Sequence, residues 1–101
     1  MTGPPFAVSL EATRGSGIAA YAPAGTPLLV RLDLAGLPDL ASYRLEIVDG
    51  AGAGVWQGSA TARNAKVESK IPGTKPGVYF IRVYSPAGVL LREFGLQIRA
   101  R

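Results

Sequence analysis

Cysteine and histidine are both absent from this chain of 101 residues, and methionine and tryptophan occur once each. No disulfide bond can therefore form, and zinc or iron sites, which rely on thiolate and imidazole ligands, are not expected. Ser-His-Asp and Cys-His catalytic sets are excluded for the same reason. The sequence predicts no catalytic residues, no metal and no other cofactor, so the protein is not expected to be an enzyme.

Long apolar runs are missing as well. No stretch approaches the roughly 18 residues of a membrane-spanning helix, so direct membrane insertion is not expected. The opening Met1-Thr2-Gly3-Pro4-Pro5 has neither the basic start nor the apolar segment of a signal peptide. We expect residues 1–5 to be a linker remnant and residues 6–101 to form a single domain, a size that one hydrophobic core can support.

The charge is mildly basic and spread along the chain. Eleven basic and seven acidic residues give a net charge of +4. Many of the basic residues stand one or two positions from an acid: Arg31 and Asp33, Arg44 and Glu46, Arg92 and Glu93. The sequence contains no basic cluster typical of nucleic-acid-binding proteins, so nucleic acid is not an expected partner.

Short runs of alternating apolar and polar residues recur along nearly the whole sequence, separated by turns rich in glycine and proline. This pattern predicts half-buried β-strands. Seven strands are expected, at residues 6–12, 28–35, 43–49, 55–57, 66–71, 78–85 and 89–99. Residues 18–21 fit a short edge continuation of the first strand. Seven short strands with a turn about every ten residues predict an all-β antiparallel sandwich.

The alternation also predicts the core and one irregularity. Inward positions carry four aromatic residues: Phe6, Tyr43, Tyr79 and Phe94. In the last strand Arg92 has the same parity as the apolar Leu90 and Phe94. A bulge near Arg92 or Gly95 would remove this mismatch and is therefore expected.

The glycine-rich segment after Asp49 favours a hairpin turn over a ligand site. Gly50-Ala51-Gly52-Ala53-Gly54 lacks the Gly-Lys-Ser/Thr ending of a phosphate-binding loop, and it joins strand to strand. The carboxylate of Asp49 alone is too little for a specific calcium site. Asp-Gly pairs are common in hairpin turns, which is the structure expected here.

The segment Pro76-Gly77-Val78-Tyr79-Phe80-Ile81 resembles the corner before the sixth strand of immunoglobulin-like domains, where a tyrosine hydroxyl, here that of Tyr79, bonds to nearby backbone. Ile81 stands where antibody-type domains carry a cysteine. The chain thus resembles the cysteine-free immunoglobulin-like modules of bacterial secreted and membrane-anchored proteins. The succession of residues 28–34, 43–47, 54–56, 71–72 and 76–79 further resembles the extracytoplasmic C-terminal domain of predicted membrane-bound anti-sigma-like proteins.

This resemblance implies a seven-stranded immunoglobulin-like antiparallel β-sandwich, located in the periplasm or at the cell surface as part of a larger bacterial protein. The expected function is that of a non-catalytic module serving protein–protein interaction, sensing or structural spacing. Its expected partner is another protein or the neighbouring domains of the parent chain, and self-association is open. A carbohydrate-binding or accessory module of a secreted hydrolase and a C-terminal secretion-sorting domain are the alternatives.

In an immunoglobulin-like arrangement the third, sixth and seventh expected strands share a sheet, whose outer face would carry an apolar stripe with a charged rim. The candidate interaction surface consists of Val48, Phe80, Arg82, Tyr84 and Leu91. The competing interpretation is that a loop or the fourth strand covers this face. Trp56 is favoured as a core residue; for the carbohydrate-binding alternative it is a candidate aromatic contact, together with Tyr21 and Tyr84.

Overall fold

The computed structural model describes residues 5–11 and 17–100. Within these residues the chain forms eight β-strands, and no helix there is long and apolar enough to cross a membrane. The expected linker, except residue 5, and residue 12 of the first expected strand lie outside the described residues. The strands are β1 (Phe6–Leu10), β2 (Ile18–Pro23), β3 (Leu28–Asp33), β4 (Tyr43–Asp49), β5 (Gly54–Ala60), β6 (Lys66–Ile71), β7 (Gly77–Tyr84) and β8 (Leu90–Arg99).

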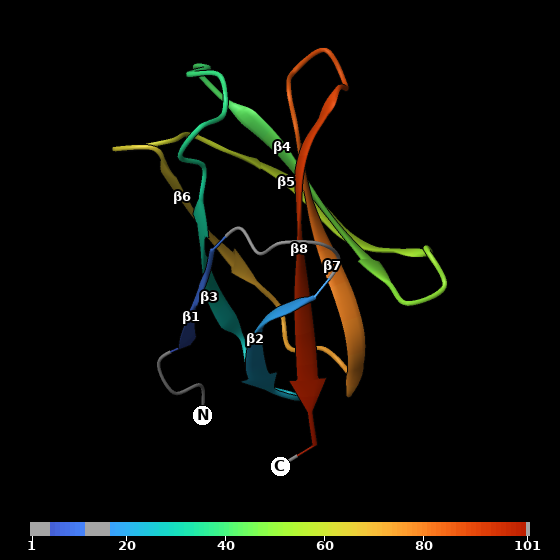
Figure 1. Ribbon diagram of the computed structural model, residues 1–101. Coiled ribbons are helices and arrows are strands. Elements are labelled where there is room, and N and C mark those ends of the chain that lie inside the picture. Colours follow the sequence, from blue (N-terminus) through green and yellow to red (C-terminus); the bar gives the residue numbers. More distant parts are fainter. Residues whose placement is uncertain (1–4, 12–16, 101) are drawn as a thin grey trace.

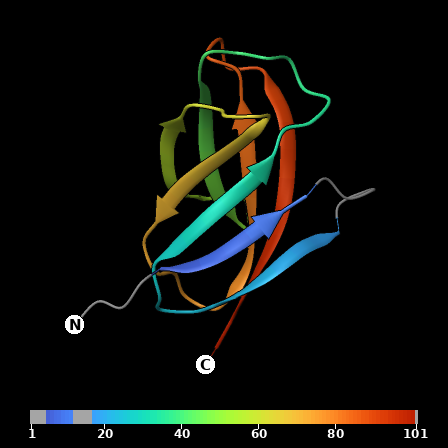
Figure 2. The ribbon, with the colours of Figure 1, turned by 90° about the vertical axis from the view of Figure 1, so that its left-hand side faces the viewer.

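The strands form a sandwich of two sheets (Figure 1). A three-stranded sheet with the order β1-β3-β6 faces the viewer in Figure 2, and a five-stranded sheet with the order β2-β8-β7-β4-β5 lies behind it. The prediction of an all-β sandwich is confirmed. The third, sixth and seventh expected strands, which correspond to β4, β7 and β8, do share one sheet.

The predicted number of strands and the predicted uniformly antiparallel pairing are wrong. The described chain has eight strands rather than seven, because β2 is a strand of its own. Instead of extending β1, it leaves that sheet and joins the edge of the five-stranded sheet. β1 runs parallel to β3, and β2 runs parallel to β8, so each sheet combines parallel and antiparallel pairs.

The bulge expected near Arg92 is present. The register of the pairing between β8 and β7 shifts at this point. Val83 lies opposite Arg92, whereas the next residue, Tyr84, lies opposite Leu90. Leu91 is the additional residue, and its half-buried side chain packs against the core. Arg92 therefore lies opposite Val83, whose side chain faces the core. The side chain of Arg92 is directed to the same side, toward the three-stranded sheet.

Two tyrosines close the core at opposite ends of β4 and β7. Tyr79 is 8% exposed and donates its hydroxyl hydrogen to the main-chain carbonyl oxygen of Lys75 at 2.9 Å, as the expected corner predicts. Tyr43 is buried, donates to the carbonyl oxygen of Pro38 and accepts the N–H of Leu40 at 3.1 Å. Each hydroxyl thus satisfies backbone groups of the segment that leads into its own strand.

The expected core is confirmed for three of its four aromatic residues. Tyr43, Tyr79 and Phe94 are buried. Phe6 is 44% exposed, so its assignment to the core is wrong. Phe6 is the first residue of β1, which lies at the edge of the three-stranded sheet, and at this end of an edge strand too few neighbours surround a large ring to bury it.

At Gly95 the backbones of β2 and β8 approach each other closely. A Cβ atom at this position would lie 2.7 Å from the carbonyl oxygen of Gly17 and 3.3 Å from Cα of Ile18. The pairing of β2 with β8 is irregular at the same point, between Ile18 and Ala20. Glycine leaves room for the two backbones to meet, so Gly95 determines how β2 docks.

Arg92 joins the two sheets near the end of β3. Its Nη1 donates to the main-chain carbonyl oxygens of Asp33 and Ala35, both at 3.0 Å. Asp33 is the last residue of β3, and Ala35 belongs to the turn that follows. A charged side chain of one sheet thus satisfies main-chain groups at the end of a strand in the other.

Candidate functional site

The predicted interaction surface lies on the five-stranded sheet, but it is not an open apolar stripe. Val48 is only 1% exposed, and Leu91 packs against the core. Both assignments are therefore wrong: Val48 lies on a central strand opposite Phe80, and the bulge turns Leu91 inward. Phe80, Arg82 and Tyr84 are half-buried on the outer face.

The polar residues of this face satisfy one another. Nε of Arg82 lies 2.8 Å from Oε2 of Glu93, and the Tyr84 hydroxyl donates to Oε1 of Glu46 at 3.2 Å. The hydrogen bond to Glu93, followed by that to Tyr84, raises the pKa of Arg82 above its ordinary value. The face therefore combines paired polar side chains with the exposed apolar residues Val78 and Leu90, and the expected protein partner stays a prediction.

The candidate aromatic contacts for a sugar are each engaged within the protein. Trp56 lies opposite the inward-facing Ile47 and packs against the core. Its ring covers Gly58, where a Cβ atom would lie 2.7 Å from the indole. The Arg99 guanidinium carbon lies 3.9 Å from the centre of the Tyr21 ring. These contacts place Trp56 half-buried at the margin of the core, so the favoured interpretation as a core residue holds only in part.

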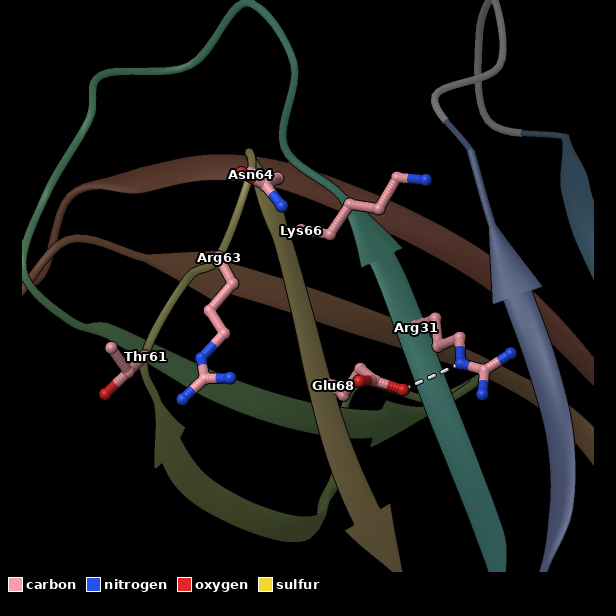
Figure 3. Close-up of a pocket in the computed structure, with 6 residues that line it drawn as sticks. All are labelled: Arg31, Thr61, Arg63, Asn64, Lys66 and Glu68. Atoms are coloured by element: carbon pink, nitrogen blue, oxygen red, sulfur yellow. Dashed lines mark hydrogen bonds and ion pairs between the residues drawn. The ribbon is translucent and has the colours of Figure 1, made fainter.

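A site that the sequence analysis did not single out lies around β6, the edge strand of the three-stranded sheet. An open hollow of about 660 Å³, which we call the basic hollow, has exposed side chains from β3, β6 and the β5–β6 connection (Figure 3). Its lining residues are Arg31, Thr61, Arg63, Asn64, Lys66 and Glu68. Three cations and one carboxylate make this hollow electropositive.

A tight turn places the main chains of two of these cations opposite each other, while Figure 3 shows their side chains on opposite sides of β6. Arg63 and Lys66 exchange both main-chain hydrogen bonds, at 2.8 and 2.9 Å, across Asn64 and Ala65. The turn residues have positive φ angles of 52° and 60°, as a type I′ turn requires. The Cα atoms of such a directly opposed pair are about 5.5 Å apart. The turn therefore concentrates positive charge at the hollow.

The nearby acids leave these two cations unpaired. The strand register places Asp33 opposite Lys66, but Oδ1 of Asp33 accepts a main-chain N–H of its own turn at 3.0 Å. Oε2 of Glu68 instead lies 2.7 Å from Nε of Arg31. Within residues 5–11 and 17–100, the side chains of Arg63 and Lys66 have no hydrogen bond or ion pair. Both therefore have their full donor capacity available.

Ala65→Gly is expected to raise the free energy of unfolding by about 0.5–1 kcal/mol. Alanine in the left-handed region costs roughly 1–2 kcal/mol, and the greater freedom of glycine in the unfolded chain cancels part of the gain. Urea denaturation followed by Trp56 fluorescence measures the change. Ala51→Gly, in an exposed loop without positive φ at that residue, is the control and should be neutral or slightly destabilising. A destabilised Ala65→Gly protein would contradict the type I′ turn.

The turn after Asp49 is the hairpin that the glycine-rich sequence favoured. Oδ1 of Asp49 accepts the N–H groups of Ala51 and Ala53, both at 2.9 Å. The carboxylate thus closes the loop and is directed at its backbone. In the part of the chain that the structure describes, no three His, Cys, Asp or Glu residues gather as a metal site would require.

No protein-family model matches the chain, and no curated protein matches it. Solved structures do. One is auracyanin B, with a TM-score of 0.57 and 13% identity over 98% of this chain and 93% of that chain. Another is auracyanin A, a "blue" copper protein from the green thermophilic photosynthetic bacterium Chloroflexus aurantiacus, with a TM-score of 0.56 and 14% identity over 95% and 100% of the two chains. At this low identity the similarity shows the fold alone, a two-sheet β-sandwich of the cupredoxin or immunoglobulin-like kind.

The similarity overturns the functional interpretation drawn from the sequence. A non-catalytic immunoglobulin-like module for interaction, sensing or spacing was inferred from the sequence, whereas the solved structures that share this sandwich fold are auracyanins, of which auracyanin A is described as a "blue" copper protein. The sugar-binding alternative, which was based on Trp56, Tyr84 and Tyr21, and the secretion-sorting alternative are withdrawn with it. The resemblance to anti-sigma-like proteins stays a prediction.

The residues of this chain do not fit a blue copper centre. Such centres bind copper through two histidines and a cysteine, with a weak axial ligand that is usually methionine. The sequence has no histidine and no cysteine, and its one methionine, Met1, lies outside the described residues. The fold is therefore present without the ligands that carry copper chemistry.

Proposed function

We propose that this protein is a cupredoxin-like sandwich without a copper centre that binds a small oxyanion, such as the phosphate group of a ligand, in the basic hollow. One observation carries the proposal: Arg63 and Lys66 line the hollow with exposed side chains that have no hydrogen bond or ion pair within the described residues. The positive φ of Ala65 is a local cost of the turn between them.

The donor set suits an oxyanion. The planar guanidinium of Arg63 can donate two parallel hydrogen bonds to a phosphate or carboxylate, and the ammonium of Lys66 adds a mobile charge. The hydroxyl of Thr61 and the amide of Asn64 line the same hollow and supply neutral donors. A volume of about 660 Å³ falls within the range of small-molecule sites.

The exposure of these side chains determines how binding should respond to salt. Charges at the surface are screened over about 10 Å at 0.1 M ionic strength and over about 30 Å at 0.01 M. Affinity for an anion should therefore be highest in dilute buffer and fall as salt is added.

The extracytoplasmic location and the absence of enzyme activity stay predictions.

The test is a titration of the protein with inorganic pyrophosphate in dilute buffer, followed by calorimetry. We expect the wild type to bind and the variant Arg63→Gln/Lys66→Gln to bind at least about tenfold more weakly, because each lost charge-assisted hydrogen bond is worth roughly 1.5–3 kcal/mol before screening. Both side chains are exposed, so the variant is expected to fold.

Lys70→Gln/Lys75→Gln is the matched control, since it removes two exposed positive charges outside the hollow. This variant should keep most of the wild-type affinity. Equal weakening of both double variants would reduce the effect to general attraction by net charge. No binding by the wild type in dilute buffer would overturn the proposed function.

A further inference from the structure

Arg31, the third cation of the basic hollow, already forms an ion pair with a carboxylate of the protein itself, that of Glu68. Nε of Arg31 and Oε2 of Glu68 are 2.7 Å apart, and the two residues lie opposite each other on β3 and β6. In Figure 3 the Glu68 carboxylate lies on the β3 side of β6 and is turned toward Arg31, while the guanidinium of Arg63 lies on the other side of β6. The carboxylate thus shields one cation and leaves the other two open.

This internal ion pair is easily displaced. The side chains of Arg31 and Glu68 are 48% and 56% exposed, and the pair uses Nε alone rather than the bidentate arrangement. Exposed pairs of this kind contribute little to stability because water and salt screen them. An anion with better charge or geometry can therefore replace Glu68 at Arg31 without disturbing the fold.

We propose that Glu68 competes with the ligand for Arg31, so that the basic hollow selects ligands with two or more negative charges. This inference rests on the proposed oxyanion site. A singly charged ligand at Lys66 gains its attraction but meets the repulsion of Glu68. A ligand with a second anionic group binds Lys66, whose side chain lies on the same side of β6 as Arg31 in Figure 3, with one group and takes the place of Glu68 at Arg31 with the other. A diphosphate or bisphosphate group has this chemistry.

The experiment compares inorganic pyrophosphate with methanesulfonate, which carries one negative charge, by titration of the protein while the backbone amide signals of Arg63, Asn64 and Lys66 are followed by NMR. In the wild type we expect pyrophosphate to bind and methanesulfonate to bind much more weakly. In Glu68→Gln the affinity for methanesulfonate should rise about five- to tenfold, and that for pyrophosphate should rise less. The ratio of the two affinities should therefore fall.

Glu93→Gln is the control variant. It raises the net charge by the same amount and breaks the other ion pair, Arg82–Glu93, which lies on the five-stranded sheet. It should leave the affinity ratio unchanged.

The possible results distinguish a failure of the proposed role of Glu68 from a failure of the proposed oxyanion site. An unchanged ratio in Glu68→Gln, with pyrophosphate still bound, would overturn the role of Glu68 and leave the oxyanion site intact. Weaker binding of both probes in Glu68→Gln would also overturn it, because Glu68 would then support the ligand. No pyrophosphate binding in any of the proteins would overturn the oxyanion site itself.

Discussion

Replacing Gly95 with alanine is expected to lower the free energy of unfolding by about 2–3 kcal/mol, the upper part of the range for overpacking a tight site. The added methyl group would lie 2.7 Å from the carbonyl oxygen of Gly17 and 3.3 Å from Cα of Ile18. Both are backbone atoms, so no side chain can rotate away to make room. β2 must move from β8, and the amides of β2 should lose protection in hydrogen exchange before the rest of the sandwich.

Gly54→Ala is the control for this variant. A Cβ atom at Gly54 would have only ordinary contact, 3.9 Å from Oε2 of Glu46, and Gly54 has no positive φ. The substitution changes the flexibility of the unfolded chain in the same way without a clash. Similar stabilities for the two variants in urea denaturation would contradict the close approach of β2 to β8.

Replacing Arg92 with methionine is expected to cost about 2 kcal/mol, because the hydrogen bonds lost are charge-assisted and are worth roughly 1.5–3 kcal/mol each when shielded from water. Arg92 donates to the carbonyl oxygens of Asp33 and Ala35, each at 3.0 Å, and methionine keeps most of the side-chain volume. The half-buried position of Arg92 reduces the full effect. Urea denaturation measures the change.

Arg82→Met removes the same charge from the outer face of β7, the strand that pairs with β8. Its partner Glu93 is largely accessible to water after the loss, so stability should hardly change. If the two arginine variants had equal stabilities, Arg92 would have no special role in joining the sheets.

The parts of the fold that alternation determines could be predicted from the sequence. Buried and exposed residues alternate along β4 and β6, so the bounds of these strands follow from the sequence. The bulge of β8 follows from the position of Arg92, where the alternation of apolar and polar residues fails. β2 could not be assigned correctly, since Ile18, Tyr21 and the alanines between them have no clear alternation. Moreover, parity does not tell which of two sheets a strand joins.

The candidate site was harder to predict because it depends on tertiary structure. Arg31 and Lys66 are far apart in the sequence and meet through the pairing of β3 with β6. The local signal was Arg63-Asn64-Ala65-Lys66, in which asparagine suits the first position of a type I′ turn and alanine does not suit the second. Which charged side chains form ion pairs could not be predicted, since the Asp33 carboxylate accepts the main-chain N–H of Ala35 instead of pairing with Lys66 opposite it.

The position of β8 has a consequence for how the chain folds. β8 is the last strand in the sequence but an inner strand of the five-stranded sheet, between β2 and β7. During synthesis β2 emerges well before β8 and has no sheet partner until β8 follows. Closing such a distant pair slows folding, toward the range of about milliseconds to seconds seen for sheet proteins dominated by long-range pairing. Until residues 90–99 have left the ribosome, β2 and β7 both keep an unpaired edge that can recruit other chains.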